Sequence, residues 1–184
     1  YWKVRVPLED GEHQYKFRLK SLSFFMPGEM VDVADPYATH LSGDKWENSC
    51  VIVKNGQPVV TTYKWQHDDK PLPPNEQLVI YELHVGDFSG GPGDANPGGS
   101  RRPGRFADVL GKLDYLAELG INAIEFMPIK EFPGDQSWGY MLRSLFTLES
   151  AYGTPDEFCQ LVDECHARGI RVLLDVVFNH SDLE

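Results

Sequence analysis

Three polar side chains of different chemistry lie close together near the end of the chain: Asp175, Asn179 and His180. The segment 170–177 is apolar except for Asp175 and Arg171, and it is typical of a strand buried on both faces in a parallel sheet. Ligands of α/β folds bind outside the carboxyl ends of such strands. Burial alone does not require an acid, an amide and an imidazole at that end, so we interpret these three residues as a candidate site.

Two aromatic residues, Trp138 and Tyr140, lie in a long loop that follows another predicted strand, residues 121–129. Aromatic rings present flat apolar faces, on which sugar rings stack through their C–H groups while nearby polar groups bind the hydroxyls. We favour this binding role for Tyr140. For Trp138, a sugar-binding position and a position in the core are equally compatible with the sequence.

Other candidate residues fit a catalytic or phosphate-binding role less well. Glu82 and Glu125 are the type of carboxylate pair that glycoside hydrolysis uses, but both lie in the middle of predicted strands, so we expect paired or hydrogen-bonded interior groups. We interpret His84 in the same way, as a core residue. The loop 89–104 is rich in glycine, but Asn96 occupies the third glycine position of a dinucleotide-binding fingerprint. We therefore expect a surface loop there.

The bulk composition narrows the classes of function. The chain has 184 residues, 41% of them hydrophobic, and a formal net charge of −11, which fits a globular protein and opposes binding to a nucleic-acid backbone. The sequence contains no run of 18 apolar residues, so we expect no membrane span. Its three cysteines form no disulfide framework, and we expect a reduced, cytoplasmic protein. The sequence does not indicate an oligomeric state.

The candidate site residues belong to a β-α-β-α-β order that begins near residue 78. Hydrophobic segments at 78–85, 121–129 and 170–177 are predicted strands, and helix-periodic segments separate them. This alternation predicts right-handed crossovers and a parallel sheet. Two α/β architectures fit: an open doubly wound sheet, or the first three strands of an eight-stranded barrel. In both, the long loops after the strands gather at one edge and build a site.

Both predicted helices have recognisable ends. The first keeps an apolar face from Phe106 to Ala117, and Gly120 is a natural stop. The second follows the capping box Thr154–Glu157, with proline at its first position, and stops at Gly169. Short connections from helix to strand, of one or two residues, are expected behind both.

Residues 1–66 show a different pattern, that of short strands without an amphipathic helix. We predict strands at 2–6, 15–19, 51–53 and 59–63, with a hairpin turn at Asn55-Gly56. A turn at 35–38 is also expected. These features predict a partial antiparallel β-sandwich over residues 1–66. The polar, proline-rich segment 67–77 is interpreted as a linker, and residues 78–184 as the α/β part.

Several segments resemble the α-amylase family of glycoside hydrolases, in the order that the family has them. DVVFNH at 175–180 resembles the first signature region of that family, and the front region with DPYA at 35–38 resembles the β-sandwich that precedes the barrel in branching and isoamylase-type debranching enzymes. The resemblance implies the first three strands of a (β/α)8 barrel preceded by a partial β-sandwich, in a chain truncated at both ends. Further matching segments are 81–89, 113–129, 137–140 and 152–158.

Position by position, the resemblance implies roles in binding an α-glucan. Tyr140 resembles the tyrosine that stacks on the sugar at the cleavage subsite, and His180 the histidine that bonds the primary hydroxyl of that sugar. Asp175 resembles the aspartate that braces the active-site network, and Trp138 lies beside Tyr140. Asn179 lies where many amylases have a calcium ligand. Several relatives with a sandwich do not use that calcium, so no metal or other cofactor is predicted.

The resemblance also implies where the chemistry takes place. The nucleophilic aspartate, the acid/base glutamate and a third carboxylate of the family come from strands four, five and seven, so no catalytic carboxylate is expected in this chain and we expect it to be inactive alone. The implied parent is a retaining enzyme acting on α-1,4 or α-1,6 glucosidic bonds. A branching transglycosylase, a non-catalytic sugar-binding relative and a nucleotide-binding α/β domain are the alternatives.

Overall fold

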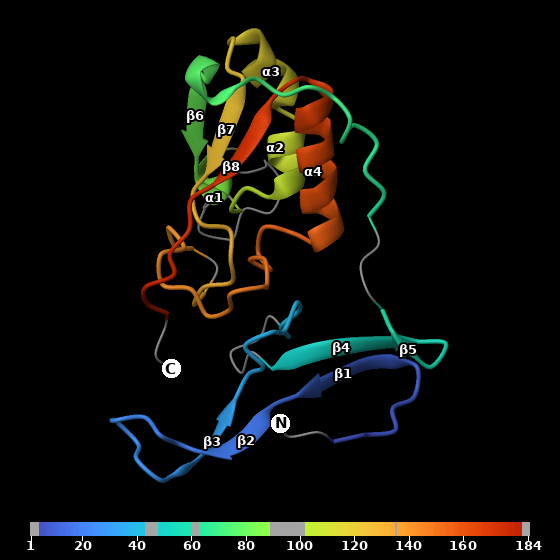
Figure 1. The fold of residues 1–184 in the computed structure, drawn as a ribbon, viewed down its shortest axis with the longest axis vertical. Helices are drawn as coiled ribbons and strands as arrows, with labels where there is room; N and C mark the ends of the chain where they lie inside the picture. The colour runs from blue at the N-terminus through green and yellow to red at the C-terminus, as the bar shows by residue number, and fades with distance from the viewer. Residues whose placement is uncertain (1–3, 43–47, 60–62, 89–101, 135, 182–184) are drawn as a thin grey trace. The chain divides into compact units, whose positions relative to one another are not determined.

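The computed structural model describes residues 4–42, 48–59, 63–88, 102–134 and 136–181. The chain divides into two compact units, residues 1–60 and residues 61–184, and each is described by itself. Figure 1 shows the elements of both units. Within the described ranges, no helix is long and apolar enough to cross a membrane.

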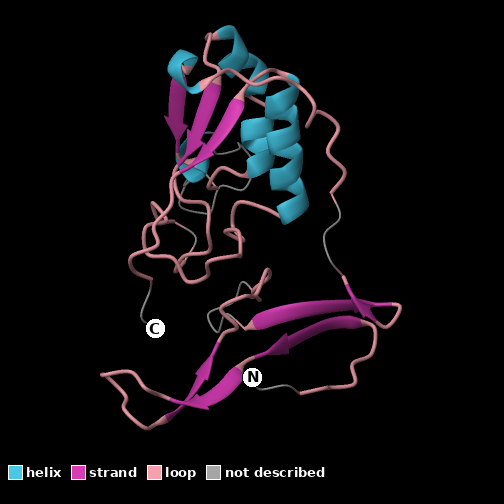
Figure 2. Cartoon of the chain, viewed as in Figure 1, coloured by secondary structure: helices cyan, strands magenta, loops and turns pink. Residues whose placement is uncertain are grey.

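In the described residues of the first unit, the secondary structure consists of antiparallel strands (Figure 2). One sheet has the order β1-β4-β5, and a separate pair joins β2 to β3. The strands are β1 Gly11–Tyr15, β2 Phe17–Lys20, β3 Met30–Val33, β4 Ser49–Lys54 and β5 Gln57–Pro58.

The predicted hairpin at Asn55-Gly56 is confirmed between β4 and β5. Asn55 has φ 54° and Gly56 has φ 69°, which is the left-handed pair that a two-residue hairpin turn of the primed type requires. The Asp10 carboxylate accepts the backbone N–H groups of both residues, at 2.7 and 2.9 Å. These two hydrogen bonds hold the pKa of Asp10 below its usual range. The predicted turn at 35–38 is also present, closed by the Ala38 N–H on the Asp35 carbonyl.

Other strand predictions in the first unit are wrong in detail. Residues 4–6 of the predicted strand 2–6 are exposed and lie outside the strands of the described part, and residues 2 and 3 lie outside the described residues. The predicted strand 15–19 is interrupted at Lys16, because β1 pairs with β4 whereas β2 pairs with β3. In the predicted strand 59–63, residues 59 and 63 are not in a strand and 60–62 are not described. Alternation alone did not show where the chain changes sheets.

The second unit contains the predicted parallel sheet. Its strands are β6 Ile80–Leu83, β7 Ala123–Phe126 and β8 Arg171–Leu174, in the order β6-β7-β8 with both neighbouring pairs parallel. The helices α2 and α4 lie along one face of this sheet (Figure 1). Each strand is shorter than predicted, but the order of elements and the direction of pairing are confirmed.

The helices differ from the prediction in one place. The predicted helix over 106–117 is two helices, α2 Phe106–Leu110 and α3 Leu113–Glu118, because Gly111 caps the first helix and Lys112, with φ −113° and ψ 3°, leaves helical geometry. Glycine has low helix propensity, yet the apolar face continues across the break, with Val109 and Leu113 both buried. The helix α4 Pro155–Ala167 has the predicted capping box. Two short helices were not predicted, η1 Asn75–Gln77 and α1 Val85–Phe88.

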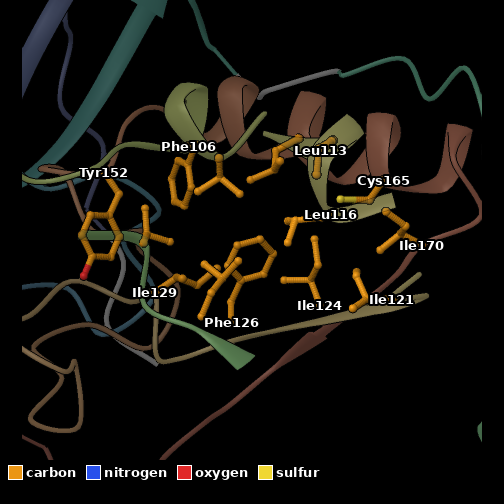
Figure 3. Close-up of a cluster of buried hydrophobic side chains, with 14 of the residues drawn as sticks. Phe106, Leu113, Leu116, Ile121, Ile124, Phe126, Ile129, Tyr152, Cys165 and Ile170 are labelled. Atoms are coloured by element: carbon orange, nitrogen blue, oxygen red, sulfur yellow. The ribbon is translucent and has the colours of Figure 1, made fainter. Parts of the chain in front are cut away.

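A single apolar core fills the space between the sheet and the helices of the second unit (Figure 3). In β7, Ile124 and Phe126 point into this core and are fully buried. The side chain of Glu125 between them therefore projects from the opposite face of the sheet. The core also contains Phe106, Leu113, Leu116, Ile129, Tyr152, Leu161, Cys165 and Ile170.

Asp163, buried in the middle of α4, fixes the segment before the sheet to this helix. Its carboxylate accepts the backbone N–H groups of Gln66 and His67 and the hydroxyl of Tyr63. Burial alone would raise the pKa of Asp163, but these hydrogen bonds outweigh burial and lower the pKa below its ordinary value of 3.8. Part of the predicted linker 67–77 therefore packs against α4, where Lys70 also donates to the carbonyl of Ala167 at 3.0 Å.

We expect Asp163→Asn to destabilise the second unit by about 1.5–3 kcal/mol at pH 7, because hydrogen bonds to a charged acceptor are lost in a buried site. A lowered pKa means that the carboxylate stabilises the fold above about pH 4 and that this contribution is lost as the pH falls through the folded-state pKa. Urea unfolding at pH 7 and pH 3 measures both effects. The control is Asp114→Asn, an exposed ion pair with Arg168, which should cost less than about 1 kcal/mol. Equal effects of the two substitutions would contradict the assignment.

Candidate functional site

The candidate site forms where β7 and β8 end. The Asp175 N–H donates to the carbonyl of Phe126 at 2.9 Å, which continues the parallel ladder one step past β8. The Asp175 carboxylate accepts the hydroxyl of Tyr140 at 2.5 Å. Two residues that are 35 positions apart in the sequence are thus joined directly, at the edge of the sheet where the sequence predicts a site.

His180 joins the same cluster from the C-terminal side. Its Nε2 lies 2.8 Å from the backbone carbonyl oxygen of Tyr140. Because a carbonyl oxygen can only accept, Nε2 carries the proton in this contact. The ring is exposed, so Nδ1 remains available to a ligand. The structure therefore brings together three of the five predicted site residues: Tyr140, Asp175 and His180.

The electrostatic environment of Tyr140 keeps its hydroxyl neutral. The hydrogen bond to Asp175, burial, and the negative charges of Asp175, Glu82 and Glu125 together raise the pKa of Tyr140 to about 12. A phenolate facing three carboxylates is disfavoured, so the hydroxyl stays a donor to Asp175 throughout the neutral range. The site as a whole is anionic, which suits a neutral ligand rich in hydroxyl donors.

Glu82 and Glu125 contribute to this field from the sheet face opposite the core. They are directly paired across β6 and β7, and Leu173 of β8 completes the row. Glu82 is exposed and Glu125 half-buried, and neither forms a hydrogen bond or ion pair with another residue of the described part. The expectation that these two carboxylates are interior groups with hydrogen-bond or ion-pair partners is therefore wrong for this chain.

The structure does not bring Trp138 and Asn179 into the cluster. Trp138 is 68% exposed, so the alternative of a core position is wrong. Asn179 is exposed and makes no hydrogen bond to a residue in the described ranges. Their sugar-binding and scaffold roles remain predictions. The glycine-rich segment around Asn96 lies outside the described residues.

The backbone of the loop between Ser137 and Tyr140 depends on Gly139, because a residue with a side chain does not fit at this position. Gly139 has φ 83°, and a Cβ at this position would lie 2.5 Å from the Pro128 carbonyl oxygen. The Gly139 N–H donates to Ser137 Oγ at 3.1 Å. The loop thus passes tightly against the end of β7 and turns Tyr140 towards Asp175.

Two buried carboxylates that the sequence analysis did not single out fix the rest of this long loop. Glu149 accepts the N–H groups of Phe132 and Ala151, at 3.1 and 2.9 Å. Glu131 accepts the N–H of Ser150 at 2.9 Å and its hydroxyl at 3.2 Å. Both acids are almost fully buried. Each acid has an apolar neighbour on one side only, Phe132 after Glu131 and Leu148 before Glu149, so the local pattern does not distinguish them from exposed acids.

One group of side chains outside this site has the chemistry of metal ligands. Glu12, His40 and Cys50 of the first unit place one ligand atom each within 4.8 Å of one another. Ligands of a tetrahedral zinc ion, with bonds of about 2.0–2.3 Å, lie closer together than that limit, at roughly 3.3–3.8 Å. Three polar groups within that wider limit do not by themselves make a metal site. Asn179 belongs to no such group among the described residues.

The cluster of Tyr140, Asp175 and His180 has the groups that bind a hydroxylated ring. Tyr140 offers an aromatic face beside a fixed carboxylate, and His180 offers a ring nitrogen, at the edge where the strands end. A hydroxylated ring can stack on the first and hydrogen-bond to the others.

Comparisons with known proteins show which family this chain is similar to. The family model described as "Alpha amylase, catalytic domain" matches residues 75–184. The malto-oligosyltrehalose trehalohydrolase of Saccharolobus solfataricus is 42% identical over 64% of this chain and 19% of its own length. The 1,4-alpha-glucan branching enzyme GlgB of Nitrosomonas eutropha is 34% identical over 97% of this chain and 23% of its own length. The chain thus spans less than a quarter of these two relatives.

A solved structure shows the same similarity in three dimensions. The GBS pullulanase SAP in complex with maltotetraose superposes with a TM-score of 0.61 and 27% identity, over 84% of this chain and 24% of that one. The matched region includes most of the chain described above, and the ligand named for that pullulanase is an oligosaccharide of glucose.

Proposed function

Because the chain belongs to the α-amylase family of glycoside hydrolases, we propose that it forms the first three βα units of a catalytic (β/α)8 barrel and one wall of its α-glucan site. The observation that carries this proposal is the hydrogen-bonded cluster of Tyr140, Asp175 and His180 at the carboxyl ends of the strands. In barrels of this type the site is built at that end. The β-sandwich over residues 1–66 and the linker over 67–77 are part of the same proposal.

Each residue of the cluster has a role in binding. Tyr140 stacks on a glucose ring and is held in place by Asp175. His180, fixed through Nε2 by the Tyr140 carbonyl, uses Nδ1 to bind a hydroxyl of the same sugar. Trp138, exposed two positions before Tyr140, extends the aromatic surface, and Asn179 supports the end of the strand.

The activity proposed for the protein that carries this chain is retaining cleavage of α-1,4 or α-1,6 glucosidic bonds. That reaction needs an acid, which protonates the glycosidic oxygen, and a carboxylate, which attacks the anomeric carbon. The proposal assigns both to later strands of the barrel. Branching is the second candidate, supported by the similarity of almost the whole chain to branching enzymes. The two reactions differ in whether water or a glucan hydroxyl resolves the intermediate.

The remaining predictions about partners and location belong to this proposal. An α-glucan is the expected partner, and a nucleic acid is not expected because the net charge is −11. A cytoplasmic location agrees with three free cysteines. No metal or other cofactor is proposed.

The test measures the binding of maltotetraose to the 184-residue chain by saturation-transfer NMR. Cellotetraose, which has the opposite anomeric linkage, is the control. We expect saturable binding of maltotetraose alone and no release of reducing sugar from glycogen, because the proposed catalytic carboxylates lie outside this chain. Equal binding of both sugars, or no binding, would overturn the proposed site. Glucan cleavage that disappears in Glu125→Gln would instead assign the chemistry to the Glu82–Glu125 pair.

A further inference from the structure

His84, at the carboxyl end of β6, is the hydrogen-bonded interior residue that the sequence suggests. Its side chain is only 11% exposed, but the ring is surrounded by oxygen atoms from three segments. Nε2 lies 2.7 Å from the Ser137 carbonyl oxygen and 2.9 Å from the Tyr152 hydroxyl. Nδ1 lies 3.1 Å from a carboxylate oxygen of Asp87. The ring therefore links β6 to two parts of the long loop that follows β7.

The chemistry of these oxygen atoms fixes the proton on the ring. The Ser137 carbonyl can only accept, so Nε2 must carry a hydrogen and donate it. The Tyr152 hydroxyl oxygen then shares this donor, and the ring of Tyr152 packs edge-on against that of His84, with centroids 6.0 Å apart. Asp87 lies 3.1 Å from the other nitrogen, Nδ1, but forms no hydrogen bond with it. The contact with Ser137 is thus a directed hydrogen bond and not a consequence of close packing.

A neighbouring glycine indicates that the ring position is specified. A Cβ on Gly86 would lie 3.0 Å from Cε1 of His84, so a larger residue would push the ring from its place. Tyr152, the acceptor that shares Nε2, is itself fully buried in the core. The imidazole of His84 is thus fixed between Gly86 and Tyr152. A ring in a fixed position can in turn fix the Ser137 carbonyl to which it donates.

The residue that His84 contacts is the first of the segment 137–140. Ser137 Oγ accepts the N–H of Gly139, and Tyr140 at the other end of the segment is bonded to Asp175 and His180. The segment is thus fixed at one end from β6 and at the other end from β8. We propose that His84 is a positioning residue, whose Nε2–H sets the place of the Ser137 backbone and thereby of the sugar-binding aromatic residues Trp138 and Tyr140.

This inference rests on the proposed function for its ligand, and its test separates the two. His84→Gln keeps an amide N–H at nearly the position of Nε2, whereas His84→Met has the same length and no donor. Maltotetraose affinity is measured for the 184-residue chain, together with backbone amide exchange of residues 137–140 and of α4 as the reference for global folding. We expect His84→Met to weaken binding by about 3- to 10-fold, the effect of one lost hydrogen bond, and to speed exchange in 137–140. His84→Gln should stay within about twofold of the original chain.

The outcomes are distinct. If the unmodified chain does not bind maltotetraose, the proposed function fails, and the exchange data still decide the role of His84. Unchanged exchange in His84→Met, or equal loss in both variants with α4 still protected, would overturn the inference. If the variants do not fold, the inference is tested on the unmodified chain by locating the proton on the His84 ring. Nitrogen-15 NMR of the His84 ring should show a protonated Nε2, and a bare Nε2 would overturn the inference as well.

Discussion

Replacing Asp175 by asparagine is expected to lower the affinity for maltotetraose by about 10- to 100-fold and to bring the pKa of Tyr140 down from about 12 towards 10. The size of the first effect follows from a hydrogen bond to a charged acceptor, which contributes about 1.5–3 kcal/mol. Asparagine has the same shape and still accepts, but without the charge that holds the phenol. The sign of the second effect follows from the same charge, because a carboxylate opposes formation of a phenolate beside it.

The pKa of Tyr140 has to be measured residue by residue, because burial also raises the pKa of Tyr15, Tyr63 and Tyr152. Carbon-13 NMR of ring-labelled tyrosine, followed from pH 8 upwards, resolves the four. The matched control is again Asp114→Asn, which should change neither the Tyr140 pKa nor the affinity. An unchanged Tyr140 pKa in Asp175→Asn would show that the 2.5 Å contact is not formed in solution. An unchanged affinity with a lowered pKa would remove Tyr140 from the binding site.

The sequence was most informative where local pattern and long-range structure agree. The parallel sheet could be predicted because buried strands and amphipathic helices alternate, and this alternation leaves few topologies. The site followed from the same topology, since the polar ends of neighbouring parallel strands meet at one edge. Asp175 and Tyr140 were assigned to that edge from their positions alone, and a direct hydrogen bond joins them there. The roles inferred from family resemblance go further than this geometry and stay predictions.

Two types of feature could not be predicted from periodicity. The first is any break that leaves the apolar face unchanged, such as that between α2 and α3, where Val109 and Leu113 remain in register with the core across Gly111. The second is a polar group buried in a loop, such as Glu149. Its carboxylate accepts the N–H groups of Phe132 and Ala151, which lie far apart in the same long loop. Both depend on contacts that form only when the loop closes.

The first unit was harder for a related reason. Strand pairing there is antiparallel and joins segments far apart in the sequence, so that β1 finds its partner in β4, some 38 residues on. Short strands with exposed faces carry little pattern of their own, as the fully exposed β2 shows. The Asn55-Gly56 turn was predictable because its left-handed geometry is a local property of the two residues.

Gly139→Ala should have the largest effect of any single substitution in the loop. A residue with a side chain at φ 83° pays about 1–2 kcal/mol for the left-handed conformation, and the added Cβ would meet the Pro128 carbonyl oxygen at 2.5 Å. Backbone atoms cannot rotate away as a side chain can, so the loop must move from the end of β7. Tyr140 would then lose its alignment with Asp175, and we expect maltotetraose affinity to fall at least about tenfold, or about 1.4 kcal/mol.

The control for this substitution lies in the same loop. Gly134 has φ 75°, and a Cβ there would meet nothing within 4 Å. Gly134→Ala therefore carries the conformational cost without the clash, and it should leave affinity and the Tyr140 pKa nearly unchanged. Binding titrations and urea unfolding of both variants separate the two contributions, since strain alone lowers stability in both. If the two variants lose affinity equally, the close approach to Pro128 has no part in positioning Tyr140, and the loop would be fixed by its hydrogen bonds to Asp175, His180 and His84 alone.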